Sequence, residues 1–162
     1  MSDQLTPATV GDLRLEIDID APTAKVWQAL TLDLGAWWPA EFYTGGVEGG
    51  RTTVLEPTPG GLMKESWDDG GGLVWATVIA VEPERRLQVQ GVTFPSWGGP
   101  NIWFGSWSLT PAGDGTKLVF EESTVGKVSS GNLAEKEKGW GYLYRQALPA
   151  YLAGEPVPPW VD

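Results

Sequence analysis

The sequence has 162 residues, of which 41% are hydrophobic and 20% charged, and these values are typical of one globular domain. Its 11 basic and 21 acidic residues give a formal net charge of -10, which disfavours nucleic acid or an anionic membrane surface as a partner. Because cysteine and histidine are both absent, disulfides, cysteine metal sites, and Ser-His-Asp or Cys-His catalysis are excluded.

The start of the chain argues against export. The opening residues, MSDQLTPATVGD, have neither the basic start nor the apolar core of a signal peptide. The longest apolar run, LVWATVIAV, is much shorter than the roughly 20 residues that a membrane-spanning helix needs. We therefore expect a cytoplasmic protein that does not insert into membranes.

A strand and two short helices are the first predicted elements. In DLRLEIDID (12–20), leucine and isoleucine alternate with charged residues, which is the pattern of a half-buried antiparallel strand. In the following segment, Val26 and Leu30 recur at helical spacing. Gly35 and Pro39 break this segment into two short helices.

Short apolar runs separated by turn signals predict six further strands between residues 43 and 123. The runs are TTVLEP, LMKESW, LVWATVIAVE, LQVQGVTF, IWFGSWSLT and KLVFEES. The turn PAGDG between the last two predicts a hairpin in which Leu109 lies opposite Leu118.

Three glycine-rich motifs could suggest ion binding but are better explained as turns. GGVEGGRT (45–52) has the spacing of a phosphate loop, with Arg51 in place of the lysine, but a strand and not a helix follows it. DDGGG and PAGDGT lack the alternating acidic ligands of a calcium loop. We therefore expect neither a phosphate loop nor a metal site.

A long C-terminal helix is predicted after Asn132, which is a suitable N-cap. Gly139, Gly141 and Pro149 weaken or kink this helix without cancelling its pattern, and the charged EKEK run is predicted to be a solvated face. The apolar stripe consists of Leu133, Trp140, Leu143, Tyr144, Ala147, Leu148, Tyr151 and Leu152.

Four segments carry a family resemblance: IDIDAPTAKVWQALT with WWP after it, ATVIAVEPERRLQV, LTPAGDGTKLVFEES and KGWGYLYRQALPAYLAGE. They resemble the START-like, or SRPBCC, helix-grip superfamily. They are most similar to bacterial homologues of the C-terminal domain of the heat shock protein 90 ATPase activator. The resemblance implies an α+β helix-grip fold, in which a curved antiparallel sheet of about seven strands wraps round the long C-terminal helix and leaves a cavity.

The resemblance also sets the expected organisation of the chain. It covers residues 12–154, so we predict a tail over 1–11, a helix-grip domain over 12–154 and a second tail over 155–162. It does not fix the chemistry, because the superfamily includes lipid carriers, cyclases and hydrolases.

Aromatic residues are crowded in the middle of the chain, where they could form core or line a cavity. Strand alternation turns Trp103 and Trp107 inward if Leu109 faces the helix. A cavity is favoured because indoles beside glycines leave space and carry N–H groups that need partners. The predicted ligand-binding residues are Trp67, Trp75, Phe94, Trp97, Trp103, Trp107, Phe120, Trp140 and Tyr144.

The segment GVTFPSWGGPNIWFGSW (91–107) is predicted to join two strands through a lid made of proline and glycine. In this interpretation Trp97 lies over the cavity mouth, while Trp103 and Trp107 line its interior. Trp97→Ala would then weaken ligand binding with little effect on folding, and Trp107→Ala would destabilise the core.

Buried carboxylates are the weak candidates for catalysis. Alternation turns Glu65 and Glu122 inward, where a carboxylate is costly unless it is paired or protonated. Tyr144 is the third weak catalytic candidate, and Arg145 or Tyr144 could satisfy either carboxylate. The same alternation groups on one inner face Met63, Glu65, Trp67, Trp75, Thr77 and Ile79.

Together these patterns predict a protein that binds a small apolar or aromatic molecule, without a cofactor or metal. The alternatives are an interaction module like the chaperone ATPase activator, and a cyclase- or hydrolase-type enzyme that uses pocket carboxylates. We expect binding rather than catalysis, and a small molecule rather than a chaperone as partner. The identity of the ligand and the oligomeric state stay open.

Overall fold

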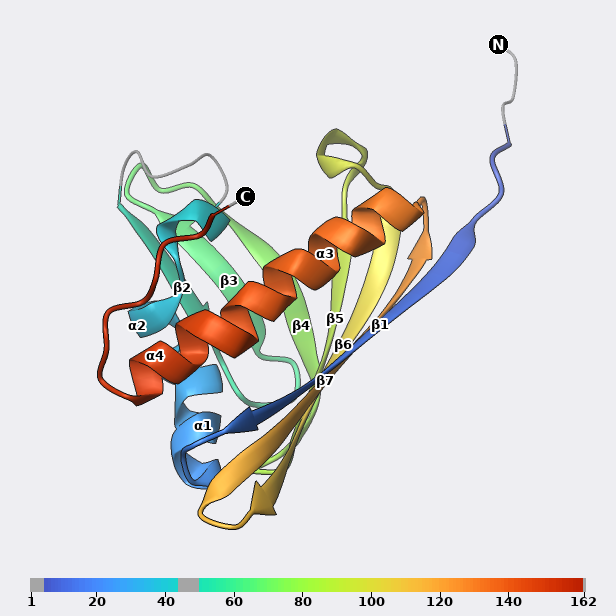
Figure 1. Cartoon of the computed structure of the whole chain (residues 1–162). Helices are drawn as coiled ribbons and strands as arrows, with labels where there is room; N and C mark the ends of the chain where they lie inside the picture. Colours follow the sequence, from blue (N-terminus) through green and yellow to red (C-terminus); the bar gives the residue numbers. More distant parts are fainter. Residues whose placement is uncertain (1–4, 44–49, 162) are drawn as a thin grey trace.

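The computed structural model describes residues 5–43 and 50–161, and these residues contain one seven-stranded antiparallel sheet (Figure 1). Its order is β1-β7-β6-β5-β4-β3-β2, so β1 pairs with β7 and the later strands form a meander. The strands are β1 (Thr9–Ile19), β2 (Arg51–Leu55), β3 (Leu62–Trp67), β4 (Gly72–Glu82), β5 (Arg86–Thr93), β6 (Asn101–Ala112) and β7 (Gly115–Gly126).

The predicted sheet is confirmed, and its first strand is longer than the alternating pattern indicated. β1 begins at Thr9, ahead of the predicted boundary at Asp12, and pairs along its whole length with β7. Most of the glycine-rich 45–52 motif lies outside the described residues, and only its end, from Gly50, can be placed.

Two short helices follow β1, as predicted. They are α1 (Thr23–Leu30) and α2 (Leu34–Trp37), and a 3-10 turn, η1 (Ala40–Phe42), comes next. The indole of Trp37 donates a hydrogen bond to the carbonyl oxygen of Ala29 at 2.8 Å, which ties α2 to the end of α1. This contact fixes where the chain leaves α2, and hence where Trp38 and Phe42 lie.

The C-terminal helix crosses the concave side of the sheet (Figure 1). It runs without interruption through α3 (Ser130–Tyr142), a π-helical turn η3 (Leu143–Ala147) and α4 (Leu148–Leu152). The predicted N-cap was wrong: Ser129 caps the helix, and the Ser129 and Asn132 side chains each accept from the other's backbone N–H. This capping box makes Asn132 the third helical residue.

The core lies between the sheet and this helix. Leu109 pairs directly with Leu118, as the hairpin prediction required. Burial also confirms the inward facing that alternation predicted for Trp103, Trp107 and Glu122, and Phe120 is buried with them. The buried side chains of the helix include Leu143, Tyr144, Ala147 and Leu148, of which Tyr144 contacts Trp107 and Phe120.

A β-bulge in β4 changes which residues face inward. The register between β3 and β4 shifts after Met63: Met63 pairs with Ala76, but Lys64 pairs with Val74. Trp75 is therefore the extra residue of β4, without a partner on β3. Beyond the bulge Ala76, not Thr77, is buried, and Ile79 is 54% exposed. The predicted inward placement of Thr77 and Ile79 was therefore wrong, because strand alternation fails across an inserted residue.

The segment after α4 folds back along the helix. Tyr142 donates from Oη to the carbonyl oxygen of Pro158 at 2.5 Å. The Trp160 ring packs edge-on against Tyr142 and Phe42, with centroids 5.0 and 5.5 Å apart. The predicted C-terminal tail thus contacts the domain through Pro158 and Trp160, whereas Val161 is 78% exposed. Within the described residues, no helix has the length and apolar character needed to cross a membrane.

Candidate functional site

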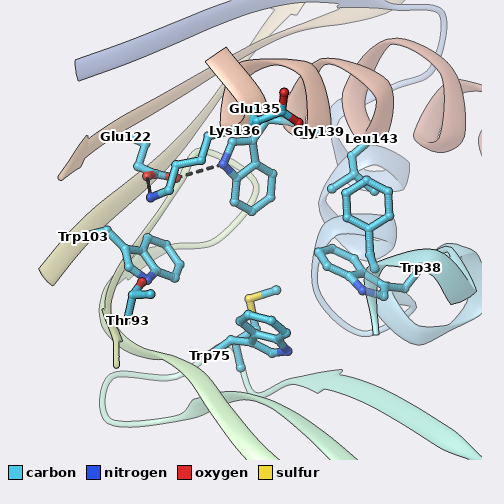
Figure 2. Close-up of a pocket in the computed structure, with 12 residues that line it drawn as sticks. Trp38, Trp75, Thr93, Trp103, Glu122, Glu135, Lys136, Gly139 and Leu143 are labelled. Atoms are coloured by element: carbon cyan, nitrogen blue, oxygen red, sulfur yellow. Dashed lines mark hydrogen bonds and ion pairs between the residues drawn. The ribbon is translucent and has the colours of Figure 1, made fainter. Parts of the chain in front are cut away.

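A cavity of about 350 Å³ lies between α3 and the inner face of the sheet (Figure 2). Small-molecule sites in proteins usually measure about 300–1,000 Å³ and are mostly apolar with a few polar groups. The cavity is lined by Trp38, Phe42, Met63, Trp75, Thr93, Trp103, Glu122, Glu135, Lys136, Gly139, Trp140 and Leu143.

Its aromatic walls come from separate elements. The bulge in β4 supplies Trp75, β6 supplies Trp103, and the C-cap residue of α2 is Trp38 (Figure 2). The helix α3 supplies Trp140. Trp103 can lie flat over β5 because Gly91 has no side chain; a Cβ there would come within 2.2 Å of the indole. Local backbone features therefore set the shape of the cavity.

A buried polar network closes one side of the cavity. Glu122 accepts hydrogen bonds from Trp140 Nε1 at 2.8 Å and from Thr124 Oγ1 at 2.9 Å. It also forms a short ion pair with Lys136, whose ammonium group donates to Thr124 Oγ1 at 3.1 Å. Because Glu122 is on β7 while Lys136 and Trp140 are on α3, the network fastens the helix to the sheet.

These partners give the Glu122 side chain a structural role. Its exposed fraction is 2%, and three donors compensate the loss of water around the carboxylate. Lys136 is less buried, with a 28% exposed side chain at the cavity edge. The predicted interior position of Glu122 is confirmed, and the ion pair corrects the expectation that the whole EKEK run is solvated.

Three of the predicted ligand-binding residues form core behind the cavity. Trp107 donates from Nε1 to Tyr144 Oη at 2.6 Å, and both residues are buried. Phe120 packs between them and Trp140, with centroid distances of 5.0 Å to Trp107 and 4.7 Å to Trp140. Trp107, Phe120 and Tyr144 thus hold Trp140 in place and do not line the cavity.

Tyr144→Phe is expected to change stability differently at neutral and alkaline pH. Burial, and to a smaller extent Glu122, raises the pKa of Tyr144 above its usual 10.0, against the opposing hydrogen bond from Trp107. The folded state therefore disfavours the phenolate, so this contribution to stability is complete below about pH 10 and is lost as pH rises further. At neutral pH the variant leaves Trp107 Nε1 without its acceptor, at a cost of about 1–3 kcal/mol.

Urea unfolding at neutral pH and across the alkaline range checks this expectation. The variant should be less stable than the native chain at neutral pH, yet lose stability less steeply above pH 10. Parallel alkaline curves for the two proteins would contradict it, since Tyr142 and Tyr151 are present in both. The raised pKa also means that Tyr144 stays protonated near neutral pH and cannot serve as a general base there.

Trp67 and Glu65 form a separate pair. Glu65 is buried and accepts a hydrogen bond from Trp67 Nε1 at 2.6 Å. The guanidinium of Arg51 lies over the Trp67 ring, 4.6 Å from its centroid. Neither Glu65 nor Trp67 lines the cavity, so the two buried carboxylates do not belong to one site.

The predicted lid does not cover the cavity. Phe94 and Trp97 are 58% and 52% exposed and pack edge-to-face on each other at 5.8 Å. Thr93 lines the cavity, so alternation at the end of β5 turns Phe94 to the opposite side. The 3-10 turn η2 (Pro95–Trp97) then returns Trp97 onto Phe94. The placement of Phe94 and Trp97 as cavity residues was therefore wrong.

Sequence comparison decides the family. The family model described as Activator of Hsp90 ATPase homolog 1-like protein matches residues 20–153. The chain belongs to this family. No curated protein matches the sequence significantly.

Comparison with solved structures shows that this member of the family has the START-like helix-grip fold. An uncharacterized protein from Rhizobium leguminosarum is 19% identical, with a TM-score of 0.64 over 92% of this chain and 98% of its own. Ara h 8.0201 is 14% identical, with a TM-score of 0.67 over 91% and 100%. DynU16, a protein of the dynemicin biosynthetic locus, is 25% identical, with a TM-score of 0.61 over 90% and 48%.

Several lining residues of this family member were not predicted from the sequence. Trp38 and Phe42 come from the chain after α2, where no periodic pattern points toward a cavity. Lys136 could have been found, because it precedes Trp140 by four residues and therefore lies on the same helix face. The unpredicted lining residues are Trp38, Phe42, Met63, Thr93, Glu135, Lys136, Gly139 and Leu143.

Proposed function

We propose that this domain binds a small, planar, largely apolar molecule in the cavity between α3 and the sheet. The observation that carries this proposal is the composition of the walls, in which four tryptophans and Phe42 surround about 350 Å³. The fold family supports it because helix-grip domains have room between sheet and helix. Trp75, Trp103 and Trp140 are the predicted ligand-binding residues that line this space.

The walls favour a flat ligand over a flexible chain. An aromatic ring stacked on an indole gains about 0.5–1.5 kcal/mol beyond the burial of its surface. Trp75 lines the cavity from β4 of the sheet, and Trp140 lines it from α3. A planar molecule between them would contact both walls at once.

The two alternatives have less support. An enzyme that uses pocket carboxylates would rely on Glu122, but that carboxylate is occupied by Lys136, Trp140 and Thr124, while Glu65 lies elsewhere. The family description names a chaperone ATPase activator. A chaperone as partner for this chain remains the other proposal, and stoichiometric recovery of the chaperone in a pull-down would favour it.

Trp75→Ala is expected to weaken binding of an uncharged aromatic probe by roughly tenfold, because it removes one stacking wall. N-phenyl-1-naphthylamine is a suitable probe because its fluorescence rises in apolar surroundings. Trp97→Ala is the matched control: the same truncation outside the cavity should leave the dissociation constant unchanged. Native mass spectrometry of freshly purified protein would identify a retained physiological ligand.

Equal probe affinity in the native chain and in Trp75→Ala would contradict the proposed site. Weaker binding in Trp97→Ala alone would instead locate the probe on the exposed Phe94–Trp97 pair. Thermal unfolding of both variants serves as the check that each remains folded under the conditions of the titration.

A further inference from the structure

Two of the cavity's tryptophans have buried N–H groups without an acceptor. Among the described residues, Trp38 Nε1 and Trp75 Nε1 are inaccessible to solvent and make no hydrogen bond. The contrast with other indoles is clear: Trp37, Trp107 and Trp140 donate to Ala29, Tyr144 and Glu122 at 2.6–2.8 Å. A buried donor without a partner costs free energy and is unusual in a folded protein.

The two tryptophans that carry the unpaired donors both line the same cavity, although protein atoms cover their Nε1 atoms. Trp38 follows α2 and Trp75 is the bulged residue of β4, so they reach the cavity from unrelated elements (Figure 2). Of the five buried side-chain polar atoms without a partner in the described residues, these are the two that lie on lining residues. Their coincidence at one site points to a bound molecule that accepts hydrogen bonds.

The charges around the cavity limit the nature of that molecule. The charged lining residues are Glu122, Glu135 and Lys136, which sum to a charge of -1. Lys136, the cationic residue among them, is already engaged by Glu122 and Thr124. A carboxylate or phosphate entering the cavity would therefore find no available cation among the described lining residues, and it would approach two carboxylates.

We infer that the ligand is an uncharged planar molecule with a carbonyl-type oxygen, which accepts hydrogen bonds from the Trp38 and Trp75 indoles. This inference rests on the proposed function and specifies the ligand class of the same site. Protein atoms cover both Nε1 atoms, so we infer in addition that each indole ring rotates slightly when the ligand enters, which brings its N–H group to the ligand. A site with such donors rejects analogues that lack the acceptor, because the donors then stay unpaired.

Four probes of similar size separate the possible ligand classes. 9-Fluorenone and fluorene share one planar skeleton and differ by the carbonyl oxygen, while fluorene-2-carboxylate adds an anion and phenyltrimethylammonium tests cation–π binding to the aromatic walls. Isothermal titration calorimetry on the full chain gives each dissociation constant. We expect 9-fluorenone to bind roughly 3–10-fold more tightly than fluorene, and both charged probes to bind more weakly.

Phenylalanine variants test the two donors directly, because they keep an aromatic wall and remove the N–H. Trp38→Phe and Trp75→Phe should each reduce the preference for 9-fluorenone over fluorene. Trp103→Phe is the matched control, since Trp103 lines the cavity but its Nε1 is not one of the unpaired buried donors. This variant should change the affinity for both probes by the same factor. Downfield shifts of the Trp38 and Trp75 indole protons in NMR spectra on adding 9-fluorenone would report the bonds themselves.

The outcomes distinguish this inference from the function on which it rests. Equal binding of 9-fluorenone and fluorene in the cavity, unaffected by Trp38→Phe and Trp75→Phe, overturns the acceptor assignment and leaves the binding function standing. Tightest binding of a charged probe also overturns it. Failure of all four probes to bind overturns both the inference and the proposed function.

Discussion

Lys136→Met is expected to lower the free energy of unfolding by about 3–5 kcal/mol, because it leaves a buried carboxylate without its cation. The Glu122 side chain is only 2% exposed and cannot turn to solvent, whereas the hydrogen bonds from Trp140 and Thr124 alone do not neutralise its charge. Urea unfolding at neutral pH measures the loss.

A second substitution shows whether charge is the cause. In the double variant Lys136→Met/Glu122→Gln, the amide at position 122 is neutral and still accepts from Trp140, so most of the lost stability should return. Lys25→Met is the control, because Lys25 is an exposed helical lysine and its replacement should change stability by no more than about 0.5 kcal/mol. A double variant as unstable as Lys136→Met would show that the loss of contacts made by the aliphatic part of the lysine, and not the loss of its charge, lowers the stability.

The ion pair also shows which parts of the site can be predicted from a sequence. Alternation along β7 predicted that Glu122 faces inward, because every residue from Leu118 to Thr124 keeps the period of two without a bulge. The pattern could not predict the partner. Lys136 meets Glu122 only through the docking of α3 on β7, which depends on contacts between segments distant in the sequence.

The bulge at Trp75 marks where the periodic argument fails. A bulge is defined by two strands together, since the extra residue in β4 exists only relative to β3. The sequence of β4 reads as an uninterrupted strand and predicts the wrong facing for Thr77 and Ile79. The same limit applies at the end of β5, where alternation was sound but the path of the following turn decided the position of Trp97.

The fold itself was easier to predict than the site. The order of strands, short helices and long helix follows from local periodicity, and the family resemblance supplied the way in which they pack. Cavity residues are a subset of the inward-facing residues, and which of them face empty space depends on the summed volumes of their neighbours. Thus Trp103 lines the cavity, whereas Trp107, four residues further along β6 on the same face, is covered by Phe120 and Tyr144.

This division between wall and core leads to the last expected result. Trp107→Ala should lower the free energy of unfolding by about 3–5 kcal/mol, as is usual when a large buried aromatic side chain is truncated. Trp107 is 4% exposed, packs on Phe120 at 5.0 Å and donates to Tyr144 Oη at 2.6 Å. The variant loses this packing and leaves the Tyr144 hydroxyl without the indole donor.

Trp97→Ala removes the same side chain from the same region and is the matched comparison. Trp97 is 52% exposed and its ring packs on Phe94, which is itself 58% exposed, so stability should change by no more than about 1 kcal/mol. Urea unfolding of the two variants measures both effects on one scale. Similar losses in the two proteins would mean that the Phe94–Trp97 pair supports the fold as strongly as the buried ring does. A loss confined to Trp107→Ala would show that the stabilising aromatic cluster lies behind the cavity wall, where Phe120 and Tyr144 pack against Trp140.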